Sequence, residues 1–377
     1  MAYSEEVDGI TRGSGAKPEY AFCTIWRLPM HGVMRRIATC LVFLACSGLA
    51  IAGTTDGMLA SAKALCQKKD YDGARRVFTK AIEMDPTCPG GYFGRGMTNV
   101  GQGDCDAAIK DFSEAIRLDP EDKTAYLNRS AVYAATKNYD AAIADANEAI
   151  RLDRQYASAY CNRSAAYFGR GDFDLAIADA NEAIRLAPQD AGGYGARSQA
   201  RCGKGDYAGA VADATRALQL DPKCRDAYVS RALAYERLRN EEEAIRDYTR
   251  AIELDPRRAD SYPYLHRADL YYRMNEFDKA IPDYTKAIKL DPKHARPYMY
   301  RGFAFFVQGD CDKAIADYSQ AIRLAPAGDN MKRASAYYAR GHAYERKGQT
   351  TEAQADFAEA RSLGLNAKSA PPGRELQ

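Results

Sequence analysis

The sequence predicts a solenoid in which one short unit recurs along most of the chain. Prolines recur along the chain, mostly 34 residues apart. One interval is 68 residues, because one proline is skipped, and one interval is 36 residues. The prolines are Pro86, Pro120, Pro188, Pro222, Pro256, Pro292 and Pro326. Two alanine positions recur in all nine units between residues 55 and 367. A fixed period of this length is typical of stacked supersecondary units, each of which buries its apolar face against its neighbours.

The positions inside each unit are numbered from 1 to 34, so that Pro120 stands at position 32. Position 20 is Ala in every unit, at Ala74, Ala108, Ala142, Ala176, Ala210, Ala244, Ala280, Ala314 and Ala353. Position 27 is also always Ala, at Ala81, Ala115, Ala149, Ala183, Ala217, Ala251, Ala287, Ala321 and Ala360. Position 4 is Tyr in eight units, at Tyr92, Tyr126, Tyr160, Tyr194, Tyr228, Tyr264, Tyr298 and Tyr337.

A 34-residue period with Tyr, Ala, Ala and Pro at these offsets resembles the tetratricopeptide repeat. The resemblance implies an all-α fold, a right-handed α-α superhelix (solenoid) of about nine 34-residue helix-turn-helix repeats. In each unit, helix A contains position 4 and helix B contains positions 20 and 27. Small alanines let helix B lie close to helix A, and the Tyr fills the gap between them with its hydroxyl at the rim. Asp or Asn at position 16 is expected to cap helix B, and Pro at position 32 ends it.

Residues 1–54 form an N-terminal extension of different composition. Residues 37–52 are a run of 16 uncharged residues that follows Arg35 and Arg36 and ends in Ala50-Ile51-Ala52. A basic segment, an apolar stretch and small residues at the end are typical of a secretory signal peptide. The run is short for a membrane span, which needs about 20 apolar residues. We therefore expect export (periplasmic or secreted) after cleavage, with an uncleaved membrane anchor and a lipoprotein at Cys46 as alternatives.

Charge and composition exclude several classes of function. The net charge is only +2, so a strongly basic nucleic-acid binder is not expected. The chain has four His and no CxxC pair, and no metal, phosphate-loop or nucleophile motif is visible, so we expect no cofactor and no catalytic residue. An enzyme would also need a catalytic domain, for which too few residues remain outside the repeats. Residues 368–377 are expected to be a disordered tail.

Two charged positions recur together. Position 7 is Arg and position 23 is Asp in the same eight units, whereas the first unit has Ser61 and Val77 at these positions. The joint presence predicts an ion pair between helix A and helix B of each unit, as between Arg129 and Asp145. The alternative is a basic stripe that binds a ligand.

The inner wall is the expected binding surface, because the resemblance implies that helix A lines a concave groove. Stacked Asn side chains suit an extended peptide backbone, and aromatic or Met side chains suit anchoring. The predicted groove residues are Asn128, Asn162, His266, Tyr272, Met299, Tyr300, Phe303, Phe306 and Tyr338. For the apolar stripe of Met299, Phe303 and Phe306, ordinary core packing is the alternative.

Together these features predict a non-enzymatic scaffold that binds a protein or an extended peptide segment in the concave groove. The alternative is a membrane-anchored structural or assembly subunit of a cell-envelope complex. Contact with a membrane is expected only if residues 37–52 remain as an anchor.

Overall fold

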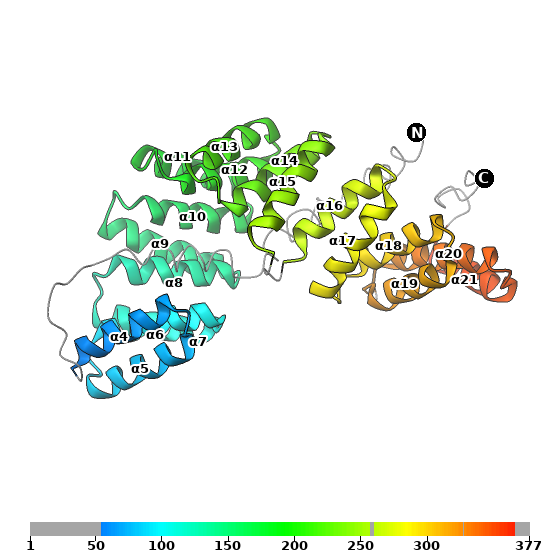
Figure 1. Ribbon diagram of the computed structural model, residues 1–377. Coiled ribbons are helices and arrows are strands. Elements are labelled where there is room, and N and C mark those ends of the chain that lie inside the picture. Colours follow the sequence, from blue (N-terminus) through cyan, green and yellow to red (C-terminus); the bar gives the residue numbers. More distant parts are fainter. Residues whose placement is uncertain (1–53, 257–259, 327, 366–377) are drawn as a thin grey trace. The chain divides into compact units, whose positions relative to one another are not determined.

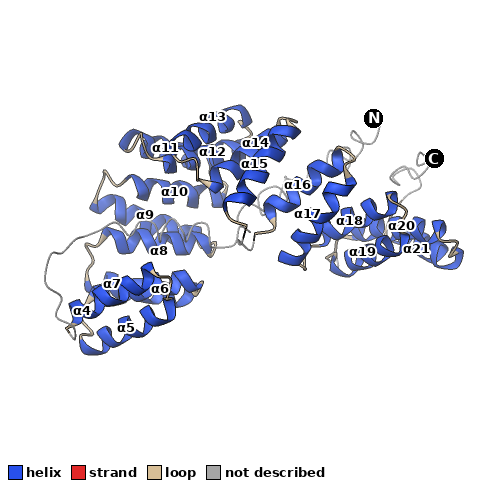
Figure 2. Cartoon of the chain, in the orientation of Figure 1, coloured by secondary structure: helices blue, strands red, loops and turns tan. Residues whose placement is uncertain are grey.

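Every regular element of the described chain is a helix (Figure 2). The computed structural model describes residues 54–256, 260–326 and 328–365, so nearly all of the predicted N-terminal extension and the whole predicted tail lie outside the described residues. Within these ranges there are 18 helices, labelled α4 to α21 as in Figure 1. The predicted all-α repeat solenoid is confirmed. None of the described helices is long and apolar enough to cross a membrane.

The chain divides into two compact units between Asn240 and Glu241. The N-terminal unit contains α4 (Thr55–Gln67), α5 (Tyr71–Met84), α6 (Pro89–Gln102), α7 (Cys105–Leu118), α8 (Lys123–Ala135), α9 (Tyr139–Leu152), α10 (Ala157–Arg170), α11 (Phe173–Leu186), α12 (Ala191–Lys204), α13 (Tyr207–Leu220) and α14 (Arg225–Arg237). The C-terminal unit contains α15 (Glu241–Leu254), α16 (Tyr262–Arg273), α17 (Phe277–Leu290), α18 (Ala295–Val307), α19 (Cys311–Leu324), α20 (Asn330–Arg346) and α21 (Thr350–Ser362).

Within each unit, consecutive helices pack as hairpins of one helix A and one helix B. Further contacts join the A helices of neighbouring repeats, as α8 with α10 and α10 with α12 in the N-terminal unit and α16 with α18 in the C-terminal unit. In both units the A helices of neighbouring repeats therefore lie side by side.

The predicted helix caps are largely confirmed. The side chains of Asp70, Asp104, Asn138, Asp206 and Asp310 each accept a hydrogen bond from a backbone N–H in the first turn of helix B. Asp172 differs, because its carboxylate instead pairs with Arg170 at 2.5 Å and makes no capping bond.

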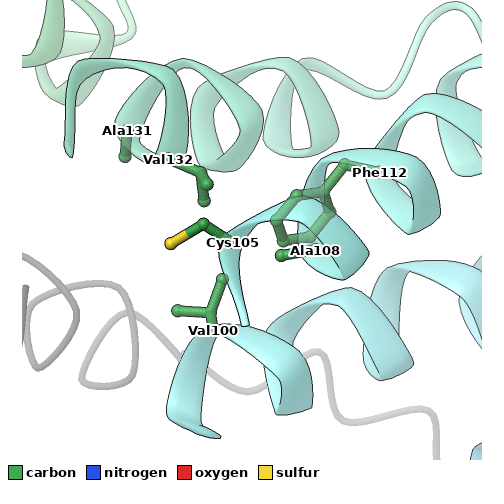
Figure 3. Close-up of a cluster of buried hydrophobic side chains, with 6 residues drawn as sticks. All are labelled: Val100, Cys105, Ala108, Phe112, Ala131 and Val132. Atoms are coloured by element: carbon green, nitrogen blue, oxygen red, sulfur yellow. The ribbon is translucent and has the colours of Figure 1, made fainter. Parts of the chain in front are cut away.

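The core is continuous from one repeat to the next. Figure 3 shows one of its clusters, in which Val100, Cys105, Ala108 and Phe112 of the second repeat meet Ala131 and Val132 of the third. The alanines at positions 20 and 27 are at most 3% exposed wherever they are described, as at Ala108 and Ala115. Their small volume leaves room for the large side chain at position 24, here Phe112.

The Arg and Asp positions form ion pairs, which confirms the predicted pairing where both partners lie in one unit. In seven repeats the Arg Nη2 donates to one carboxylate oxygen at 2.6–2.8 Å and Nε donates to the other at 2.7–2.9 Å. The seven pairs are Arg95–Asp111, Arg129–Asp145, Arg163–Asp179, Arg197–Asp213, Arg267–Asp283, Arg301–Asp317 and Arg340–Asp356. Arg231 and Asp247 lie in different units.

The same arginines also link neighbouring repeats. In all eight cases, Nη1 donates to the side chain at position 25 of the preceding repeat. The acceptors are Thr79, Ser113, Asn147, Asn181, Thr215, Thr249, Thr285 and Ser319. Because the ion pairs and these hydrogen bonds occupy the guanidinium donors within the fold, the structure does not support the alternative of a basic ligand-binding stripe.

Candidate functional site

Four half-buried aromatic side chains meet on the C-terminal unit, and we call them the aromatic cluster: Tyr272, Phe277, Tyr300 and Phe303. The ring centroid of Tyr272 lies 5.0 Å from that of Tyr300 and 5.4 Å from that of Phe303, both in edge-on geometry. Phe277 contacts Tyr272 and Phe303 at 5.8 and 6.2 Å. These are favourable distances and orientations for aromatic pairs.

The A helices α16 and α18 supply three of the four rings, and α17 supplies Phe277. Because α16 and α18 contact each other, the structure brings the predicted groove residues Tyr272, Tyr300 and Phe303 together. Each of these side chains keeps part of its surface accessible to solvent.

A charged group borders the aromatic cluster. The Asp269 side chain is only 4% exposed, and its carboxylate accepts a hydrogen bond of 2.8 Å from the Tyr284 hydroxyl. Arg296 Nη2 lies 2.7 Å from the other carboxylate oxygen, and the Arg296 side chain is 44% exposed. The Arg296 guanidinium also lies 5.5 Å from the centre of the Tyr300 ring. One end of the cluster therefore combines an accessible cation with an aromatic face.

Tyr284 remains a hydrogen-bond donor in this arrangement. Burial, together with the neighbouring Asp269, raises the pKa of the Tyr284 hydroxyl well above its ordinary value. Its ring stacks on Tyr300 with a centroid distance of 6.3 Å and an angle of 15°. Tyr284 therefore fixes both Asp269 and Tyr300 from below the accessible surface.

The other apolar groove residues, Met299 and Phe306, lie elsewhere in the C-terminal unit. Met299 and Phe306 pack against the core of Ala314, Tyr318 and Ala343. The Phe306 ring is also covered by the Arg346 guanidinium at 5.3 Å. These contacts support the core alternative for Met299 and Phe306. Phe303, the third residue of the predicted stripe, lies in the aromatic cluster instead.

Tyr338 belongs to a separate aromatic group in the last hairpin. Its ring contacts His342 at 4.5 Å and Phe357 at 5.6 Å. His342 and Phe357 lie in α20 and α21, so these two contacts tie Tyr338 to the last hairpin.

The polar groove residues take part in the fold itself. His266 is 8% exposed and packs against Tyr262 at 4.1 Å and Tyr248 at 5.8 Å. Asn128 is 7% exposed, and its Nδ2 donates to the carbonyl of Thr124 at 2.7 Å. Asn162 is half-buried, and its Nδ2 donates to the carbonyl of Leu127 in the preceding repeat at 3.0 Å. These three side chains therefore offer less surface than the sequence suggested.

Asp269, Arg296 and Phe277 were not predicted as site residues. Asp269 did carry a signal, because position 9 holds Met97, Ala131, Ala165 and Leu233 in other repeats, and an acid in this place is unusual. No comparable pattern distinguishes Arg296. Phe277 stands at the start of helix B, where an aromatic residue is frequent in this chain and therefore uninformative.

The described chain holds no group of His, Cys, Asp and Glu suited to a metal ion. None of the seven cysteines among the described residues forms a disulfide, so Cys66 and Cys105 of neighbouring repeats are not joined; the seven are Cys66, Cys88, Cys105, Cys161, Cys202, Cys224 and Cys311.

Comparison with known proteins gives a consistent result. Tetratricopeptide repeat families match residues 57–88, 93–157, 157–190, 226–258, 265–329 and 334–363, which is more than half of the chain. A search of curated proteins found no match.

Three solved structures illustrate the likeness. A tetratricopeptide repeat protein from Parabacteroides merdae has 20% identity and a TM-score of 0.45, over 70% of this chain and 97% of the other. MamA has 26% identity and a TM-score of 0.41, over 44% and 93%. The pilF protein of Pseudomonas aeruginosa has 19% identity and a TM-score of 0.50, over 57% and 96%. The likeness to pilF concerns the fold alone. The repeat positions, the helical hairpins and the family matches agree, and the chain belongs to the tetratricopeptide repeat family.

Proposed function

We propose that this protein is a non-enzymatic scaffold that binds a protein or an extended peptide segment, with the aromatic cluster of the C-terminal unit as its anchor site. Tetratricopeptide repeat proteins generally bind proteins or peptides and are generally not enzymes. The observation that carries the proposal is the group of accessible rings on α16 to α18, bordered by Arg296.

The chemistry of the aromatic cluster favours a mixed ligand. Aromatic side chains that meet at a partly accessible surface supply much of the energy of interfaces when a partner covers them. Arg296 is already paired with Asp269 and is therefore held in place before a ligand arrives. A peptide with an apolar or aromatic anchor residue next to an acidic residue fits both features.

The test uses peptides selected from a random display library against the purified full chain, measured by fluorescence polarisation. Phe303→Ala should weaken binding, because it removes a ring of the aromatic cluster. Tyr338→Ala is the matched control, since it removes a half-buried ring from the same unit outside the cluster. Circular dichroism melts of both variants separate lost binding from lost folding.

Equal affinity of the wild type and Phe303→Ala for every selected peptide would contradict the proposal. The same holds if Tyr338→Ala loses binding and Phe303→Ala does not.

A further inference from the structure

A second surface, in the N-terminal unit, is independent of the aromatic cluster. A hollow of about 640 Å³ lies between the first two repeats, lined by residues of α5, α6 and α7. Five of its lining residues are cations: Arg75, Arg76, Lys80, Arg95 and Lys110. Only Glu83 and Asp111 oppose them.

Four of these cations are available for a ligand. Arg95 is paired with Asp111 at the floor of the hollow, with Nη2 at 2.7 Å from the carboxylate. Arg75, Arg76, Lys80 and Lys110 are exposed, and none makes an ion pair within the described residues. Their positive charge is therefore not neutralised by this part of the chain.

The B helices that follow α5 carry ion pairs at the equivalent positions. Position 26 is Glu and position 29 is Arg in α7, α9 and α11, and they pair at 2.6–2.8 Å as Glu114–Arg117, Glu148–Arg151 and Glu182–Arg185. In α5 the two charges are exchanged, because Lys80 stands at position 26 and Glu83 stands at position 29. Position 22, which holds Arg76 and Lys110 here, is Ala144, Ala178 and Ala212 in the next three repeats.

The hollow itself coincides with an exceptional residue at position 11. Four other repeats have a Tyr there whose ring lies 5.7–6.0 Å from the guanidinium of the position-7 Arg, at Tyr133, Tyr167, Tyr235 and Tyr344. The second repeat has Asn99, which is 3% exposed and donates from Nδ2 to Asp111 at 2.9 Å. The smaller Asn leaves space that a Tyr ring fills in those repeats.

Asn99 also leaves one acceptor unsatisfied. Its buried Oδ1 has no hydrogen-bond partner among the described residues. A buried acceptor without a donor destabilises the folded state.

We propose that this hollow docks an acidic peptide segment of a partner protein. Carboxylates of such a segment match the four exposed cations that line the hollow. A nucleic acid or a membrane is less suitable, since the chain as a whole carries a net charge of only +2 and its cations gather here around a local hollow.

The test titrates the purified full chain with a fluorescein-labelled peptide of alternating Glu and Gly, followed by fluorescence anisotropy. Arg76→Gln combined with Lys110→Gln removes two exposed cations of the hollow. Asn99→Tyr fills the hollow with the residue that other repeats carry. The matched control is Arg117→Gln combined with Arg151→Gln, which removes two exposed cations of the neighbouring B helices.

We expect the wild type and the control to bind alike and the Arg76–Lys110 variant to bind about tenfold more weakly. Asn99→Tyr should also weaken binding, and a circular dichroism melt checks that this variant folds. Binding should fall as salt rises to about 0.15 M, where the Debye length is about 8 Å.

Three outcomes would overturn the proposal. The first is no binding of the peptide by the wild type, and the second is equal binding by all variants. The third is binding of single-stranded DNA or of phosphatidylglycerol vesicles, but not of the peptide. If Asn99→Tyr failed to fold, the exposed Arg76–Lys110 variant would still decide between these outcomes.

Discussion

Replacing Asp145 by Ala tests the ion pairs that recur along the chain. In the wild type, Asp145 accepts two hydrogen bonds from Arg129, at 2.7 Å from Nε and 2.8 Å from Nη2. The Asp145 side chain is 8% exposed and the Arg129 side chain is 17% exposed. The variant leaves the Arg129 guanidinium largely buried, with its bond to Ser113 but without its counter-charge.

The expected loss follows from this burial. Removing one partner of a fully buried pair costs about 3–5 kcal/mol, whereas an exposed pair contributes about 0–1 kcal/mol. Because Arg129 retains some contact with water, we expect Asp145→Ala to lower the free energy of unfolding by about 2–3 kcal/mol.

Glu148→Ala is the matched control for this experiment. Glu148 is an acid on the same helix, and its pair with Arg151 is exposed, with side-chain exposures of 44% and 64%. We expect a loss of about 0.5 kcal/mol. Urea unfolding followed by circular dichroism measures both, and hydrogen exchange of the third repeat reports local opening, since repeat arrays need not unfold in one step. Equal losses for the two variants would refute the reasoning.

Three further predictions use other parts of the chain. Burial raises the pKa of the Cys202 thiol to about 12, so iodoacetamide at pH 8 should leave Cys202 unmodified in the folded protein and label it after unfolding. Because the folded state holds this proton to higher pH than the unfolded state, Cys202 should also make stability fall above about pH 8.5, as a pH series of urea unfolding curves would show. Phe306→Ala should lower stability by about 2–4 kcal/mol, given its core contacts, without weakening peptide binding; an unchanged melting temperature would contradict this. We also propose export with cleavage before Gly53, so the purified exported protein should begin at that residue and show no Trp emission, and retained Trp26 would exclude it.

The sequence predicted the helical hairpins and the ion pairs because each residue of the pattern recurs many times in one chain. Arg at position 7 and Asp at position 23 are absent together from the first repeat, and this coincidence alone indicated contact. The hydrogen bond from Arg to position 25 was not predicted. Thr, Ser and Asn alternate at that position, and the only feature common to all three is a side-chain oxygen that can accept a hydrogen bond.

The candidate site was predicted less completely, for a geometric reason. Residues spaced by three or four lie on one side of a helix, but a helix in a solenoid contacts its own hairpin and two neighbours on adjoining sides. Phe303 and Phe306 are three residues apart, yet one ring meets Tyr272 and the other meets the Tyr318 core. Spacing within one helix does not tell these environments apart.

Departures from the repeat pattern therefore carry information that the pattern itself does not. The stability of a repeat array depends on the interfaces between neighbours, so residues that recur at one position reflect packing. Tyr at position 11 adds a contact with Arg in four repeats, and Asn99 forgoes that contact and leaves a buried acceptor unpaired. The unpaired cations Arg76 and Lys110 stand beside the same hollow, at a position where the next three repeats have Ala. Neither departure improves packing, and both change the same surface in a way that suits an acidic ligand, so we expect Asn99→Tyr to weaken binding of the acidic peptide.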